Sequence, residues 1–172
     1  MKIALKKELT GSILDIGGGG EGIIGRLYGS RVTAIDNRQE ELDEAPDTCT
    51  KLCMDATALS FADESFDAVT AFYSLLFMTA GEQERAIAEG IRVLRPGGRL
   101  CLWDCAVKSA YPNPFVTELD VDLEGELLHT SYGICKLDAQ SRESILSFCL
   151  AKGLTLLASR QEGIHFYLEL QK

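Results

Sequence analysis

The sequence has no apolar run long enough to cross a bilayer. Its longest uncharged stretch, residues 68–81, is short and includes Thr, Ser and Tyr. The first residues, MKIALKKELTG, carry lysines but lack the apolar centre of a signal peptide. These absences predict a cytoplasmic protein that does not enter a membrane.

Positive charge is also scarce. The 172 residues include 17 Lys and Arg against 26 Asp and Glu, a net charge of -9, and no basic stripe occurs anywhere. Binding to a nucleic-acid backbone requires such a positive surface. We therefore expect a small-molecule substrate and no nucleic-acid partner.

The six cysteines lack the spacing of a metal site. Cys49 and Cys53 are separated by three residues, as are Cys101 and Cys105, whereas zinc sites typically begin with two closer cysteines. Most lie in apolar segments such as RLCLWDCAV. We expect them to be small buried side chains in a reducing compartment, and we expect no metal.

Short apolar runs alternate with helical segments along the chain, which is typical of βαβ units around a parallel sheet. Strands are expected at residues 12–16, 31–36, 51–55, 65–75, 99–107, 154–161 and 165–171. Helices are expected at residues 21–28, 38–45, 81–94 and 141–153. With no repeat and no linker, residues 1–172 are expected to form a single domain.

An extra segment, residues 108–138, separates the fifth strand from the last helix. In it, FVTELDVDLEG alternates apolar with acidic residues, and ELLHTSYGI follows. This pattern predicts a β-hairpin at 115–134 with a solvated acidic face. Its apolar row should cover either the active crevice or a second subunit, which makes a homodimer through the hairpin a further expectation. As a lid, the hairpin should be removable without loss of cofactor binding.

The segment ILDIGGGGEGIIGRL, residues 13–27, can be interpreted in two ways. Gly17, Gly19 and Gly22 fit a dinucleotide fingerprint, with Asp36 as the ribose acid. Asp15 followed by the same glycines fits the loop of an enzyme that uses S-adenosylmethionine (SAM). Asp15 and Glu21 would repel a pyrophosphate but attract the ammonium and sulfonium of SAM, so charge favours SAM. In a third interpretation, Asp15 only accepts hydrogen bonds from the amides of the loop, which would favour neither ligand.

Four segments in order resemble class I SAM-dependent methyltransferases: ILDIGGGG, VTAIDNR, CMDATALSFADESFDAVTAFYSL and EGIRVLRPGGRLCLWD. The resemblance covers nearly the whole chain. It implies a Rossmann-like, doubly wound α/β fold with a seven-stranded, mostly parallel sheet, an antiparallel last strand beside the fifth, and the hairpin inserted after strand five. It also implies methyl transfer from SAM to an unidentified, small-molecule acceptor.

The resemblance assigns cofactor contacts to eight residues: Asp15, Gly17, Gly19, Asp36, Asn37, Asp55, Ala56 and Phe72. Within this set, Asp36 would accept from the ribose hydroxyls, Asp55 from the adenine amino group, and Asp15 would lie by the ammonium. Gly17 and Gly19 would leave room for the methionine part. The chain departs from the family at Glu21, which stands where a third glycine is usual.

Candidates on the acceptor side are Tyr73, Asp104, His129 and Tyr132, and none of them is singled out as a general base. Two other functions stay open. One is a SAM-binding sensor or partner subunit without turnover. The other is a nicotinamide-dependent oxidoreductase domain, which the acidic loop disfavours.

Overall fold

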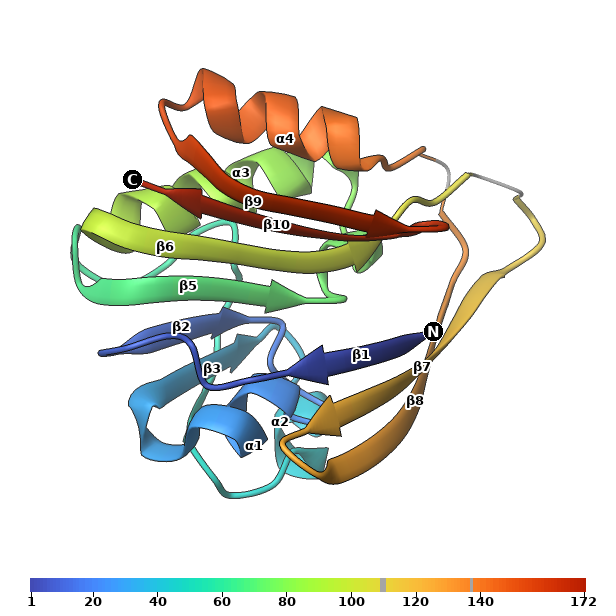
Figure 1. Ribbon diagram of the computed structural model, residues 1–172, viewed down its shortest axis with the longest axis horizontal. Helices are drawn as coiled ribbons and strands as arrows, with labels where there is room; N and C mark the ends of the chain where they lie inside the picture. Colours follow the sequence, from blue (N-terminus) through green and yellow to red (C-terminus); the bar gives the residue numbers. More distant parts are fainter. Residues whose placement is uncertain (109–110, 137) are drawn as a thin grey trace.

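The computed structural model describes residues 1–108, 111–136 and 138–172, and its main sheet has seven strands in the order β4-β3-β2-β5-β6-β10-β9 (Figure 1). Strand β10 runs antiparallel to both neighbours, and the other strands are parallel to one another. The predicted fold class and the antiparallel strand beside the fifth are confirmed. The strands are β2 (Ile13–Ile16), β3 (Val32–Asp36), β4 (Thr50–Cys53), β5 (Phe66–Phe72), β6 (Leu94–Cys105), β9 (Thr155–Glu162) and β10 (His165–Gln171).

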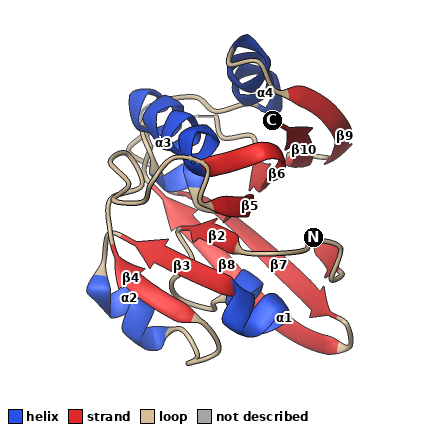
Figure 2. Ribbon diagram, turned by 90° about the vertical axis from the view of Figure 1, so that its left-hand side faces the viewer, coloured by secondary structure: helices blue, strands red, loops and turns tan. Residues whose placement is uncertain are grey.

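Helices cover the two faces of this sheet, as Figure 2 shows. One face packs against α3 (Ala80–Val93) and α4 (Arg142–Ala151), and the other against α1 (Ile23–Tyr28). A short α2 (Gln39–Glu44) follows β3, and 3-10 turns occur at Gly29–Arg31 and Leu75–Phe77. Helix α3 begins after Thr79, whose hydroxyl accepts from the Glu82 amide while the Glu82 carboxylate accepts from the Thr79 amide at 2.7 Å. No helix of the described ranges is long and apolar enough to span a membrane.

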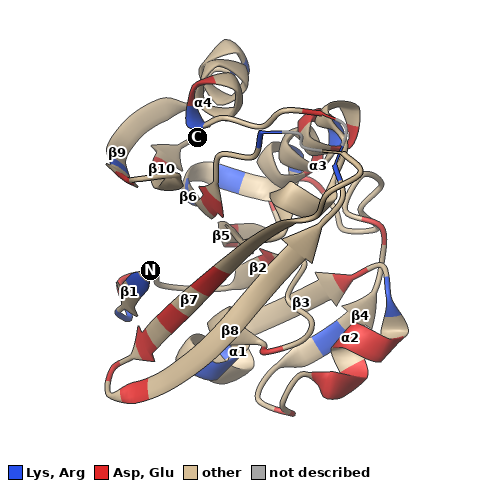
Figure 3. Ribbon diagram, turned by 90° about the vertical axis from the view of Figure 1, so that its right-hand side faces the viewer, with Lys and Arg blue, Asp and Glu red and all other residues tan. Residues whose placement is uncertain are grey.

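A second, three-stranded sheet covers part of the α1 face. The predicted hairpin is confirmed as β7 (Phe115–Leu123) and β8 (Glu126–Ile134), while β1 (Lys2–Leu5), which was not predicted, pairs with β7 in parallel. Two residues of the expected 108–138 insertion, 109 and 110, and residue 137 lie outside the described part of the chain. The acidic residues of β7, red along the strand in Figure 3, alternate with its buried residues and are exposed or half-buried.

The apolar row of the hairpin is buried within this chain. Leu119 and Val121 are 0% exposed, and they share a core cluster with Leu5 of β1 and Ile24 of α1. The expectation that this row covers the crevice or a second subunit is therefore wrong. The expectation was wrong because it did not include β1. This strand pairs with β7 and helps to bury the apolar row of the hairpin in the core of the same chain.

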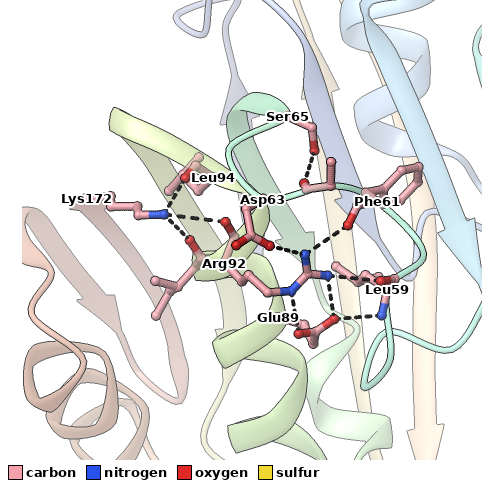
Figure 4. A network of polar contacts seen from close by, with 10 residues as sticks. Leu59, Phe61, Asp63, Ser65, Glu89, Arg92, Leu94 and Lys172 are labelled. Carbon is pink, nitrogen blue, oxygen red and sulfur yellow. Dashed lines mark hydrogen bonds and ion pairs between the residues drawn. The ribbon is translucent and has the colours of Figure 1, made fainter.

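The connection from β4 to β5 contains no helix, and a polar network holds it instead (Figure 4). Arg92, near the end of α3, donates to the carbonyl oxygens of Phe61 at 2.9 Å and Leu59 at 3.0 Å. Its guanidinium also pairs with Asp63 at 2.7 Å and Glu89 at 2.8 Å. This network fixes the loop whose first residues, beginning at Asp55, lie at the carboxyl edge of the sheet.

Candidate functional site

A cleft of about 860 Å³ lies at the carboxyl ends of β2, β3 and β5, where ligands bind in open α/β sheets. It is lined by all eight residues that the sequence assigned to the cofactor: Asp15, Gly17, Gly19, Asp36, Asn37, Asp55, Ala56 and Phe72. Of the four acceptor-side candidates, Tyr73 and Tyr132 line it. The topology thus brings together residues from five separate segments of the chain.

The glycine loop packs tightly against its own chain. The amides of Gly17 and Gly18 donate to the carbonyl oxygen of Ile35 at 2.8 and 3.0 Å. Gly17 has a φ of +70°, and a Cβ there would lie 2.3 Å from the Ser74 Cβ. A Cβ on Gly19 would lie 2.6 Å from the Glu41 Cβ of α2. Their missing side chains thus let the loop approach Ser74, which follows β5, and Glu41 of α2. That the same glycines leave room for the methionine part stays a prediction.

Asp15 lies beneath this loop and is only 2% exposed. Its Oδ1 accepts from the Thr70 hydroxyl at 2.7 Å. Burial raises the pKa of Asp15 to about 7, the Thr70 hydrogen bond opposes that rise, and the negative charge of Asp36 adds to it. A cation bound at this end of the cleft would favour the ionised carboxylate.

Asp36 and Asp55 each use one carboxylate oxygen to shape the loop that follows. Asp36 Oδ1 accepts from the Arg38 amide at 3.0 Å, and Asp55 Oδ1 accepts from the amide and hydroxyl of Thr57 at 2.8 Å. Those hydrogen bonds lower the pKa of Asp55. Within the described residues, neither Oδ2 atom takes part in a hydrogen bond. Each aspartate therefore has an acceptor oxygen left for the hydroxyl or amino groups of a ligand.

The cleft as a whole is acidic. Its two arginines are already paired, Arg38 with Glu41 at 2.8 Å and Arg26 with Glu126 at 3.0 Å. Seven carboxylates line it: Asp15, Glu21, Asp36, Glu41, Glu44, Asp55 and Glu82. Such a surface attracts a cationic ligand and disfavours a pyrophosphate. The donor set thus fits SAM better than a nicotinamide dinucleotide.

The hairpin forms one wall of the cleft through β8. The rings of Tyr132 and Tyr73 stack with centroids 5.3 Å apart and planes 10° from parallel. The Thr130 hydroxyl donates to the Glu21 carboxylate, so the hairpin is also tied to the glycine loop. Glu21, the departure from the family pattern, is the residue that makes this contact.

The other two acceptor-side candidates lie outside the cleft. Asp104 is fully buried and accepts from the Cys105 amide at 2.8 Å and the Gln140 side chain at 2.7 Å, and burial raises its pKa to about 7. His129 pairs with Asp120 at 2.9 Å on the exposed face of the hairpin. His129 is not among the residues of β8 that line the cleft.

Some lining residues were missed from the sequence. Ser74, Phe77 and Met78 follow β5 and line the cleft, and the Ser74 hydroxyl donates to the Ile16 carbonyl oxygen at 2.7 Å. Their position just beyond Tyr73 was a usable signal. Ser131 and Gly133 of β8 also line the cleft. No signal in the sequence indicated them, because their place in the cleft depends on how the hairpin packs over the sheet.

Comparison with known proteins agrees with this geometry. Residues 14–102 match the model of the methyltransferase domain family. The chain is 30% identical over 148 residues to a phosphatidylethanolamine N-methyltransferase of Cereibacter sphaeroides, covering 79% of this chain and 71% of that protein. It is 37% identical over 101 residues to a ubiquinone/menaquinone biosynthesis C-methyltransferase of Paracoccus denitrificans, covering 51% of this chain but only 40% of that protein.

A solved structure shows the same fold. The crystal structure of a SAM-dependent methyltransferase from Methanosarcina mazei superposes with a TM-score of 0.65 at 21% identity. The superposition covers 95% of this chain and 94% of that one.

Proposed function

This chain belongs to the methyltransferase domain family, and from that premise we propose that it binds SAM in the acidic cleft and transfers its methyl group to a small-molecule acceptor. The acidity of the cleft is the observation that carries this proposal, because the family ligand is a cation at its reactive end. The same acidity argues against a nucleic-acid substrate.

Three aspartates hold the cofactor in this proposal. The free oxygen of Asp36 accepts from the ribose hydroxyls, that of Asp55 accepts from the adenine amino group, and Asp15 lies by the ammonium. Asn37 and Ala56 flank the adenine. Phe72 and Tyr73 lie under the methionine part and face the acceptor.

The cofactor supplies a methyl carbon on a positively charged sulfur, so the acceptor's electron pair forms the new bond while the electrons of the carbon–sulfur bond stay on sulfur. The chain has to align the two molecules and exclude water. The stacked rings of Tyr73 and Tyr132, where the hairpin meets the cleft, are suited to both tasks.

The relatives' names point to different acceptors, a quinone pathway in one case and a phospholipid headgroup in the other. The acceptor of this chain therefore has to be found by experiment. Incubation with labelled SAM and cell extract, followed by mass identification of the product, tests transfer directly. A folded protein that binds SAM and labels nothing would favour the sensor without turnover.

The binding half of the proposal is tested by calorimetry with the Asp36→Ala variant. We expect SAM to bind in the micromolar range and the variant to bind at least tenfold more weakly, because charge-assisted hydrogen bonds contribute about 1.5–3 kcal/mol each. Asp43→Ala, on the exposed side of α2, is the matched control and should bind like the parent. Equal affinity in all three would refute the ribose assignment, and a folded parent without SAM binding would refute the proposed function.

A further inference from the structure

A second cleft, of about 580 Å³, lies between β1 and the face of β6, β10 and β9 that points away from α3 and α4. Alternation along the strands directs Trp103 of β6, Tyr167 of β10 and Arg160 of β9 into it. These three residues are neighbours in register, Trp103 opposite Tyr167 and Tyr167 opposite Arg160. They form a continuous row across three strands.

The row has an aromatic end and a cationic end. The rings of Trp103 and Tyr167 are half-buried, with centroids 4.8 Å apart and planes tilted by 31°. The Arg160 guanidinium lies 5.9 Å from the centre of the Tyr167 ring. A flat aromatic ligand can lie along the two rings and direct an acidic group at the guanidinium.

The charge of this cleft is opposite to that of the first, acidic cleft, which we call the cofactor cleft because the proposed function assigns it to SAM. Arg160 takes part in no ion pair within the described residues, whereas the Arg99 guanidinium is paired with Glu169 at 2.9 Å. The cations lining the cleft outnumber its acids, with Lys2, Lys6, Arg99 and Arg160 against Glu8, Glu162 and Glu169. In a chain of net charge -9, this is a place where an anion can bind.

The two clefts meet at Tyr73. Tyr73 lines both of them: its ring stacks on Tyr132 on the cofactor side, and its hydroxyl shares a 2.7 Å hydrogen bond with Nδ1 of His165 on the other. Phe72 lines the cofactor cleft and lies 6.1 Å from Trp103, between ring centroids. Tyr73 also has a φ of 48°, which is uncommon for a bulky residue and frequent at ligand sites.

We propose that the second cleft is a ligand site distinct from the cofactor cleft and that it takes a flat aromatic molecule with an acidic group at one end. The acidic group pairs with Arg160, the rings lie on Tyr167 and Trp103, and the opposite end points to Tyr73 and His165. This inference does not rest on the proposed function.

Binding can be tested without methyl transfer, using 2-naphthoate as the probe. Calorimetry measures its affinity, and the emission of Trp103, the one tryptophan of the chain, reports whether the probe reaches this cleft. We expect saturable binding that changes Trp103 emission and is at least fivefold weaker in Arg160→Gln. Arg142→Gln, which removes an arginine on α4, is the matched control and should stay within twofold of the parent.

The outcomes separate this inference from the proposed function. Absence of saturable binding, equal affinity in Arg160→Gln, or displacement of the probe by SAM would each overturn this ligand site. Asp36→Ala should lose SAM affinity and keep naphthoate affinity within twofold. If the parent binds naphthoate through Arg160 but does not bind SAM, the ligand site stands and the methyltransferase proposal fails.

Discussion

At the scale of single residues, Asp15 is a carboxyl group in the cofactor cleft whose burial is energetically unfavourable. A carboxyl that is nearly inaccessible to water would ordinarily be replaced by an apolar side chain in a protein core. Here it keeps one strong hydrogen bond, to Thr70, and lies near a second carboxylate, Asp36. Such a residue is useful if a cation binds beside it, and it destabilises the protein when no cation does.

The raised pKa of Asp15 predicts how stability depends on pH. Its pKa is about 7 in the folded protein and 3.8 without the protein environment, so between these values the unfolded chain has released a proton that the folded chain keeps. Its contribution to the free energy of unfolding is therefore largest below pH 4, falls between pH 4 and 7, and is constant above 7. Asp15→Asn cannot titrate, but it can still accept from Thr70.

We expect this variant to lose less stability than the parent between pH 4.5 and 7.5, by roughly 1 kcal/mol or more, since one pKa unit corresponds to about 1.4 kcal/mol. Urea unfolding at a series of pH values measures it. Asp43→Asn, on the solvent side of α2, is the control and should follow the parent. Parallel curves for Asp15→Asn and the parent would show that Asp15 is ionised throughout.

The cysteines are a second feature at this scale. Cys101, Cys105 and Cys149 are buried, as expected from their apolar segments, and burial raises the thiol pKa of each to about 12. Cys53 and Cys135 are exposed, contrary to the general expectation. The difference follows from position, since Cys53 ends the edge strand β4 and Cys135 follows β8.

At the scale of elements, the hairpin and β1 form a sheet that shapes the cofactor cleft while belonging to the core. The expectation that residues 115–134 can be replaced by a flexible link without loss of SAM binding does not fit this structure. Removal would expose the cluster around Leu119 and Ile24 and would leave β1 without a partner. Point substitutions on the cleft side of β8 are the suitable probes.

Thr130→Val removes the hydroxyl that joins the hairpin to Glu21 and keeps the shape of the side chain. Thr130 is only 3% exposed, so the Glu21 carboxylate loses a hydrogen bond in a partly buried position. We expect a loss of about 1–3 kcal/mol in the free energy of unfolding, typical of a buried acceptor left unpaired. Urea unfolding measures the loss.

Thr117→Val is the matched control for this prediction. Thr117 lies on the paired strand β7, opposite Tyr132, and is 7% exposed. Its hydroxyl makes no side-chain hydrogen bond within the described residues, so the same substitution should have a much smaller effect. If both variants lose the same stability, the Glu21 contact is not what holds the hairpin to the glycine loop.

At the scale of the whole molecule, the two sheets and the helices should unfold together. One core cluster lies between the main sheet and α3 and α4, and the other joins the opposite face to α1, β1 and the hairpin. Leu119→Ala creates a cavity in the second cluster, and we expect it to lower the free energy of unfolding by about 2–5 kcal/mol. Circular dichroism and Trp103 emission should give coincident transitions in urea.

Leu127→Ala, on the neighbouring strand of the hairpin, is the control, because Leu127 is 62% exposed. It should change stability by less than about 0.5 kcal/mol. Separate transitions for the two probes in the Leu119→Ala protein would show that the hairpin unfolds as an independent lid, as the sequence alone suggested.

Local sequence signals were sufficient for most of the main sheet. The apolar runs from Ile13 to Phe72 and the helix after Thr79 carry their own periodicity and capping residues, so strands and helices there follow from short-range pattern. That Asp15, Asp36 and Asp55 line one cleft could also be predicted, because parallel strands end at one edge of the sheet. Their roles toward the cofactor come from the family resemblance and stay predictions.

What the sequence by itself determined is thus the α/β class, the order of most elements and the aspartates at the strand ends. Only the tertiary structure decided that KIAL, residues 2–5, is a strand, because its partner β7 lies more than a hundred residues away in the chain. It also decided that His129 and Asp104 lie outside the cofactor cleft, and that Trp103, Tyr167 and Arg160 lie together in the second cleft. Packing and strand pairing between distant segments set these positions, and no local pattern of residues encodes them.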